Sequence, residues 1–301
     1  MTAPETDPGL PRVDPRALRR ALARAAPAFD RTALLAHEVE GRLLERLDLM
    51  QADPDRVLVA DARAGASGRA LARRFPRAGK FLTDPSPAML AEARRRRPWR
   101  SRQHFCAAWS DALPFRSGLF GLAWSNLGLQ WANDLDRVLR EQHRVLGPEG
   151  LLLFSSLGPD TLAELRAALP AAFRRPPEMP VFIDMHDVGD ALSRAGFEGV
   201  VMENEVITVT YPDLRSLLAD ARSTASGALL ADRPRGLLTP RRLAALEAAL
   251  PREDGRIPAR FEVVYGHAWR PASGAVAADP SGTARIGVDQ IGRASQGAGS
   301  V

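Results

Sequence analysis

The sequence predicts an α/β fold built on a doubly wound, mainly parallel sheet. Between residues 56 and 155, short apolar runs alternate with segments of about ten residues that have helical spacing, which is the pattern of βαβ units. Leu151–Ser155 is a continuous apolar run, as expected for a strand that is covered on both faces. Two later strand patterns, 200–210 and 261–269, flank a helical stretch, and this arrangement fits an antiparallel pair that closes the sheet.

The first half supplies the elements of the parallel part in turn. Residues 32–50 carry apolar side chains at helical spacing, such as Leu35, Val39 and Leu43. Asp84-Pro85-Ser86-Pro87 is a helix start signal, because proline near the first helical position already has a helical φ. The predicted strands are 56–60, 80–83, 104–108, 119–124 and 151–155. The predicted helices between them are 68–75, 88–97 and 133–145.

The composition divides the chain into three parts. We expect a flexible N-terminal lead-in over 1–30, which begins acidic and proline-rich and contains one short Arg/Ala helix. We also expect a disordered, Ala/Gly/Ser-rich tail over 272–301. The main domain spans 31–271 and includes an arginine-rich helical insertion over 212–257. Two further helices are predicted, and they cover 160–169 and 187–195.

Composition and motifs exclude several classes of protein. The single cysteine, Cys106, excludes a disulfide scaffold, a cysteine-only zinc site and a CxxC redox motif. The five histidines include no pair four residues apart and no HExxH motif, so no metal site is expected. No nucleic-acid-binding motif accompanies the net charge of +5, and no nucleic-acid partner is expected. Without an apolar leader or an apolar run of about 18 residues, the sequence favours a cytoplasmic protein with no membrane contact.

The predicted sheet indicates where a ligand would bind. In doubly wound sheets, ligands bind outside the carboxyl ends of the strands, near the point where the strand order reverses. Four segments fall there, and they are 60–68, Asp84, 109–115 and 125–131. Asp84 ends a strand, where an acid accepts hydrogen bonds from a ribose diol. It is equally placed to cap the following helix, and the two roles are compatible.

Several segments resemble one enzyme family. Ser125–Trp131 (SNLGLQW) and the stretch RVLREQHRVLGPEGLLLFSSLGPDTLAELR over 137–166 are similar to the S-adenosylmethionine-dependent methyltransferases of biotin synthesis, the malonyl-acyl carrier protein O-methyltransferases. The segments 182–197, 205–214 and 261–269 also look like that family. The same residues resemble mitochondrial relatives that assist assembly of respiratory complex I. The resemblance runs from about residue 30 to residue 271. It implies a class I, Rossmann-like methyltransferase fold with a lid-like helical insertion, S-adenosylmethionine as the cofactor and acyl carrier protein as the partner.

The resemblance also implies site residues. The residues expected to bind S-adenosylmethionine are Asp61, Gly65, Asp84, Trp109, Ser110 and Asn126. The residues expected to bind the acceptor are Gln130, Trp131 and Arg222. Trp109 stands where the family has an acid for the adenine amino group. Its ring can stack on adenine but cannot accept a hydrogen bond, and Asp111, two positions later, is a possible substitute.

The first loop departs from the family pattern, which is an acid followed by three glycines, roughly DLGCGTG. Aligned without gaps, the acid becomes Val59, the first two glycines become Asp61 and Arg63, and the third is kept as Gly65. A register shifted by two makes Asp61 the acid and replaces two glycines with Arg63 and Ser67. In both registers an arginine stands where glycine would let the backbone approach the cofactor.

The leading hypothesis is methyl transfer to a carboxylate oxygen of a malonyl group on acyl carrier protein. A carboxylate is ionised at pH 7 and needs no base, so no catalytic acid or base is assigned. A lid arginine, Arg215 or Arg222, is a candidate to hold the acyl carboxylate. Two alternatives stay open: a non-catalytic homologue that has lost cofactor binding, and an enzyme that modifies a protein side chain. The arginines of 212–260 are either a docking surface for the acidic carrier protein or solvated helix faces.

Overall fold

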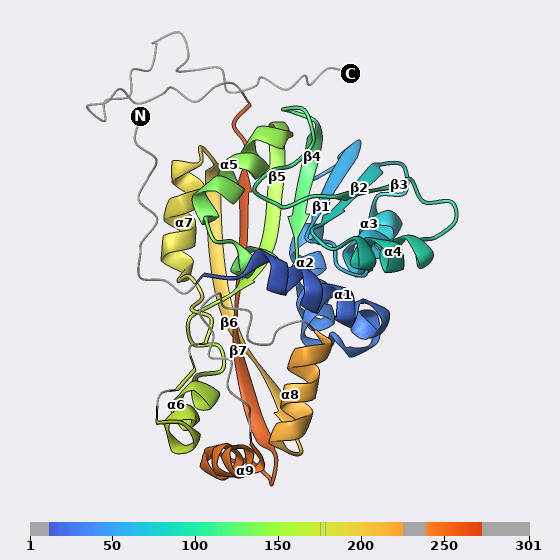
Figure 1. Ribbon diagram of the computed structural model, residues 1–301. Coiled ribbons are helices and arrows are strands. Elements are labelled where there is room, and N and C mark those ends of the chain that lie inside the picture. The colour runs from blue at the N-terminus through green and yellow to red at the C-terminus, as the bar shows by residue number, and fades with distance from the viewer. Residues whose placement is uncertain (1–11, 175, 178, 225–238, 273–301) are drawn as a thin grey trace, which may run out of the picture.

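The computed structural model describes residues 12–174, 176–177, 179–224 and 239–272. Over these residues, seven strands form one sheet in the order β3-β2-β1-β4-β5-β7-β6 (Figure 1). The first five strands in chain order are parallel, and β7 lies antiparallel between β5 and β6. The strands are β1 Arg56–Ala60, β2 Gly79–Asp84, β3 Gln103–Ala107, β4 Phe120–Ser125, β5 Leu146–Leu157, β6 Glu198–Tyr211 and β7 Ile257–Trp269. The doubly wound, mainly parallel sheet with a final antiparallel strand is therefore confirmed.

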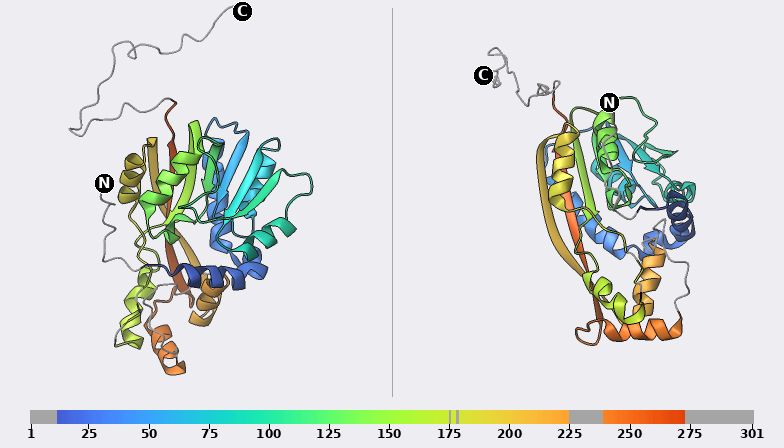
Figure 2. Two further views of the ribbon diagram at one scale, coloured as in Figure 1. Left: turned by 45° about the horizontal axis from the view of Figure 1, so that its top comes forward. Right: turned by 60° about the vertical axis from the view of Figure 1, so that its left-hand side comes forward.

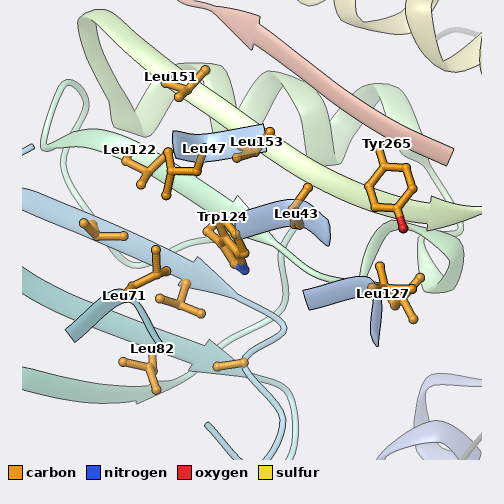
Figure 3. Packing of buried hydrophobic residues seen from close by; sticks show 14 of the residues in the cluster. Leu43, Leu47, Leu71, Leu82, Leu122, Trp124, Leu127, Leu151, Leu153 and Tyr265 are labelled. Carbon is orange, nitrogen blue, oxygen red and sulfur yellow. The ribbon is translucent and has the colours of Figure 1, made fainter. Parts of the chain in front are cut away.

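Helices cover both faces of the sheet. On one face, α2, α3 and α4 pack on a cluster that includes Leu82, Trp124 and Tyr265 (Figure 3). On the other face, α5 and α7 pack on a second cluster that includes Leu58 and Phe154. Neighbouring residues of one strand point to opposite faces, which explains why the central strands are apolar throughout. The helices are α1 Pro15–Thr32, α2 Leu34–Asp48, α3 Ala66–Arg74, α4 Pro87–Arg95, the short 3-10 helix η1 Leu129–Trp131, α5 Leu135–Val145, α6 Ala163–Ala172, α7 Met185–Arg194, α8 Leu214–Ser223 and α9 Pro240–Ala249.

The arginine- and alanine-rich helix expected in the lead-in is present as α1, but it is longer than expected and it packs on the main domain. Helix α1 begins after Asp14, whose carboxylate accepts a hydrogen bond from the backbone N of Arg16, and it buries seven apolar residues. That face packs on Ala64 and Met89, at the carboxyl ends of β1 and β2, and α1 lies beside α4 and α8 (Figure 2). The backbone N of Val13 donates to Asn133 Oδ1 at 2.9 Å, and Asn133 Nδ2 donates to Val13 O at 3.0 Å. Helix α1 is thus part of the fold, while residues 1–11 lie outside the described residues.

The far ends of β6 and β7 form, together with α6, α8 and α9, a small unit at one end of the molecule, here called the insertion layer (Figure 1). Strands β6 and β7 run past the other strands, and α6, α8 and α9 pack at their far end (Figures 1 and 2). Their small core includes Leu169, Leu214, Leu217 and Leu246. The predicted insertion contains helices α8 and α9, and residues 225–238 between them lie outside the described residues, as do 273–301 of the tail. In the described part of the chain, no helix combines the length and the apolarity needed to cross a membrane.

Candidate active site

The loop after β1 has an unusual backbone. Asp61, Arg63 and Gly65 all have left-handed φ angles, of 51°, 48° and 83°. These are the three positions that the gap-free alignment assigns to glycine. Ser67, the glycine position of the shifted register, lies in the first turn of α3. A left-handed residue favours glycine and an α-helical one does not, so the backbone supports the gap-free alignment. Asp61 then stands at a glycine position, and Val59, fully buried in β1, replaces the family's acid.

Arg63 and Asp84 form a buried ion pair beside this loop. The backbone N and the Nη1 atom of Arg63 both donate to Asp84 Oδ2, at 3.0 and 2.9 Å. Ser86 N donates to the other oxygen of Asp84 at 2.8 Å. The expectation that Asp84 caps the following helix is wrong, because the N-cap of α4 is Ser86, whose hydroxyl accepts a hydrogen bond from Met89 N. Asp61 Oδ1 lies 3.6 Å from Arg63 Nη1. Burial lowers the pKa of Arg63, but the charges of Asp84 and Asp61 outweigh it, and the guanidinium stays protonated.

Burial works against the charge of Asp84 itself. Its side chain is wholly buried at the end of β2, and desolvation raises the pKa of its carboxyl group. The guanidinium of Arg63 counteracts this effect, because an adjacent positive charge favours the ionised carboxylate. The ionised form of Asp84 therefore depends on Arg63. This carboxylate was expected to face a cofactor, and in the structure it faces an arginine of its own chain.

A cleft of about 420 Å³, here called the outer cleft, lies at the carboxyl ends of the strands. It is lined by residues after β3 and β4 and by the start of α1, among them Trp109, Ser110, Asp111, Gly128 and Trp131. The hydroxyl of Ser110 donates to Asp61 Oδ2 at 2.7 Å. A Cβ atom at Gly128 would lie 2.6 Å from that same oxygen, so only glycine fits there. Trp109, Ser110 and Asp111 therefore share one cleft, while Gly65 is not part of its lining and lies against Ala93.

A second pocket lies under the insertion. This insertion pocket, of about 100 Å³, is lined by residues of the loops after β1 and β4, of α2 and of α8, including Arg63, Gln130 and Trp131. Tyr211 donates its hydroxyl to Asp220 at 2.8 Å across one wall. Gln130 Oε1 is buried without a hydrogen-bond partner among the described residues. The lining does not include Arg222, which is exposed on α8.

Asn126 belongs to an internal network with Glu40, which sequence reasoning missed. Asn126 Nδ2 donates to Glu40 Oε2 at 2.8 Å and to Ala36 O at 2.9 Å, and Ser155 Oγ donates to Asn126 Oδ1. Ser67 Oγ donates to Glu40 Oε2 at 2.6 Å. Asn126 lines the insertion pocket, but these bonds tie its side chain to α2. A glutamate in an amphipathic helix gives no sequence signal of such a role.

Glu40 should make stability depend on pH. Burial raises the pKa of Glu40 from 4.5 to about 7, against the hydrogen bonds from Ser67 and Asn126. An acid with a raised pKa binds more protons in the folded state, so the free energy of unfolding should fall between about pH 4.5 and 7, by at most about 3 kcal/mol. Urea unfolding at pH 5 and pH 7.5 measures this loss. Glu40→Gln should remove it, whereas Glu38→Gln, on the exposed side of the same helix, should retain it; an unchanged loss in Glu40→Gln contradicts the assignment.

Comparisons with known proteins agree with this geometry. A family model described as a methyltransferase domain matches residues 62–154. A malonyl-acyl-carrier protein O-methyltransferase of Halorhodospira halophila is 42% identical over 93% of this chain and 96% of its own length. The chain belongs to the malonyl-acyl-carrier protein O-methyltransferase family. A relative of the same name from Laribacter hongkongensis is 43% identical over 86% of the chain and 91% of its own length.

Solved structures support the fold of this methyltransferase family. The YcgJ protein of Bacillus subtilis superposes with a TM-score of 0.57 at 13% identity, covering 79% of this chain and 100% of its own. The Bacillus halodurans protein BH2331 gives 0.54 at 16% identity, covering 77% of this chain and 98% of its own. At such identities the likeness concerns the fold alone, and it is the class I methyltransferase fold.

Membership of this methyltransferase family implies S-adenosylmethionine, but in the described structure Arg63 holds the carboxylate at the end of β2 and little space is left against the loop. The space directly against the loop, lined by Arg63, Ala64, Ser67 and Asn126, measures only about 30 Å³ and is here called the loop cavity. A cavity of that size has room for a few water molecules. Asp84 is at the strand end where a ribose would be held, yet Arg63 already occupies it. Among the described residues, no group of three or more potential metal ligands occurs either.

Proposed function

We propose that this protein methylates a free carboxylate of a malonyl group carried by acyl carrier protein, with S-adenosylmethionine as the methyl donor. The observation that carries the proposal is the 42% identity to a relative of that name over 96% of the relative's length. The insertion pocket supports it, because Gln130 and Trp131, the expected acceptor residues, both line it. A cytoplasmic location belongs to the same proposal.

The acceptor needs no base. A malonyl carboxylate is ionised at neutral pH, so the task of the protein is to orient it and to exclude water. Tyr211 and Asp220 do not act as a base in this proposal, because their hydroxyl and carboxyl groups hydrogen-bond each other. Burial raises the pKa of Asp220, which reduces its repulsion of an anionic acceptor.

A transfer assay tests the proposal. Purified protein is incubated with S-adenosylmethionine labelled in its methyl group and with malonyl-acyl carrier protein, and label on the carrier is measured. We expect a base-labile methyl ester on malonyl-acyl carrier protein and none on acetyl-acyl carrier protein, which lacks the free carboxylate. Equal labelling of both carriers, or of neither, would reject this acceptor.

The Arg63–Asp84 pair favours a second candidate, a non-catalytic homologue that does not bind S-adenosylmethionine. In that case the guanidinium permanently replaces the ligand at Asp84. The two candidates differ in a binding measurement that needs no turnover. Calorimetry of the unaltered chain with S-adenosylhomocysteine should give saturable binding for an enzyme and no binding for a homologue that has lost the site.

Arginines of the insertion are candidates for docking the acidic carrier. Arg241 and Arg242 are exposed in the first turn of α9, at the far end of the insertion layer. We expect Arg241→Glu/Arg242→Glu to weaken carrier binding several-fold at about 0.1 M salt, because opposite charges steer association over about 10 Å at that ionic strength. The measurement is fluorescence titration of labelled carrier at about 0.1 and 1 M salt.

The control is Arg73→Glu/Arg77→Glu, which changes the net charge equally. Arg73 and Arg77 are exposed in α3 and just after it, away from the insertion. This variant should bind the carrier nearly as well as the unaltered chain. Equal weakening in both variants would mean that net charge, and not α9, governs the association.

A further inference from the structure

We infer that Arg63 competes with the cofactor for Asp84, so that S-adenosylmethionine binds this chain only when the guanidinium leaves that carboxylate. The inference rests on the proposed function, because it concerns how that function's cofactor gains its site. It makes Arg63 the residue that sets cofactor affinity, although the side chain takes no part in methyl transfer.

The competition follows from the position of Asp84. The carboxylate stands at the end of β2, next to β1, where doubly wound sheets hold a ribose diol. Arg63 directs two donors, a backbone N–H and Nη1, to the Oδ2 atom of Asp84. Ser86 takes the other oxygen. A ribose hydroxyl can bond this carboxylate in the usual way only by displacing the side-chain donor.

The path of the Arg63 side chain also closes the space that a ligand needs. Arg63 lines both the loop cavity and the insertion pocket, so its side chain lies between the two. Its side chain is only 11% exposed. Removal of this side chain would enlarge the loop cavity toward the insertion pocket, because Arg63 lines both.

Two features indicate that the arginine is held at a cost, which favours its displacement. Its backbone has a φ of 48°, which side chains rarely adopt. Its Nη2 atom is buried without a hydrogen-bond partner among the described residues, although a buried donor of this kind is usually paired. A guanidinium whose donors are only partly satisfied loses less on leaving than a fully bonded one.

Calorimetry with S-adenosylhomocysteine tests the competition, because this ligand carries no transferable methyl group. We expect Arg63→Gly to lower the dissociation constant by at least about tenfold relative to the unaltered chain. The control is Glu149→Gly, which relieves a left-handed residue with a φ of 57° at the start of β5, away from the carboxyl ends of the strands. This control should leave the dissociation constant unchanged.

A second variant covers the case in which Arg63→Gly does not fold. Arg63→Gln keeps most of the side-chain volume and a hydrogen-bond donor but removes the charge, and it should bind S-adenosylhomocysteine more tightly than the unaltered chain. Equal affinity of the unaltered chain and the Arg63 variants would overturn the inference, and so would an absence of binding in all of them. Failure of the proposed function looks different: the variants then bind S-adenosylhomocysteine tightly, but no malonyl carrier is methylated.

Discussion

Arg63→Ala should lower the free energy of unfolding by about 3–5 kcal/mol, the typical loss when one partner of a buried ion pair is removed. The loss arises because the wholly buried carboxylate of Asp84 keeps only the N–H groups of the backbone as partners. Urea unfolding at pH 7 measures it. Adding Asp84→Asn to Arg63→Ala removes the unpaired charge and should restore part of the stability.

Exposed pairs provide the comparison. Arg194 pairs with Asp136 at 2.9 Å, and the Arg194 side chain is 58% exposed. Arg194→Ala should therefore cost no more than about 1 kcal/mol. If Arg63→Ala lowers the free energy of unfolding no more than Arg194→Ala does, Arg63→Ala does not leave an unpaired buried charge at Asp84. Such a result would contradict the buried ion pair between Arg63 and Asp84.

The cost of Arg63→Ala should also depend on pH. Burial already raises the pKa of Asp84, and without Arg63 the charge that opposes this rise is lost. The folded variant then holds a proton that the unfolded chain has released, so its stability falls as pH rises above the ordinary pKa of the carboxyl group, 3.8. The deficit relative to the unaltered chain should shrink toward pH 4 and be largest near pH 7.

Gly65→Ala should cost about 3 kcal/mol. A Cβ atom there would lie 2.7 Å from the Cβ and 3.0 Å from the Cα of Ala93 in α4, and the φ of 83° adds backbone strain of about 1–2 kcal/mol. Gly118→Ala is the matched control, because Gly118 has a φ of 68° and nothing within 4 Å of an added Cβ. It should show the backbone strain alone, so the difference between the two variants measures the contact with Ala93.

Urea unfolding of both glycine variants provides the test. If Gly65→Ala costs no more than Gly118→Ala, then α4 moves away at little cost. In that case the close approach of the loop to α4 does not fix the conformation of Gly65, and the loop can change shape when a ligand arrives.

The strands of the sheet can be predicted from the sequence because each of them has a local pattern of apolar residues. The apolar run of β1 begins and ends where predicted, at Arg56 and Ala60. Strand β5 begins at Leu146 instead of 151, because Leu146 pairs with Phe120 ahead of an irregularity between Phe120 and Leu122. Such a pairing depends on a neighbouring strand, and no local pattern encodes it.

Residues that act through distant partners are harder to predict. The sequence shows that Arg63 stands where the family has glycine. It does not show the ion pair with Asp84, because that pair joins positions 21 residues apart. Glu40 reaches Asn126 across 86 residues. The packing of the expected lead-in helix could not be predicted, because the buried face of α1 consists mostly of small side chains that resemble a solvated segment. The site residues of the outer cleft stay a prediction until a ligand is bound.

The anchoring of α1 by Asn133 has a consequence for the order of assembly. The two hydrogen bonds between Val13 and Asn133 join residues 120 positions apart. During synthesis the ribosome releases α1 before residue 133 has been made. The hydrogen bonds between Val13 and Asn133 can therefore form only after β1 to β4 have been made. Closing a chain segment of that length also costs conformational entropy, which delays the docking further. Helix α1 can pack on Ala64 and Met89 earlier, but the contact between Val13 and Asn133 forms only after the segment that carries Asn133 has been made.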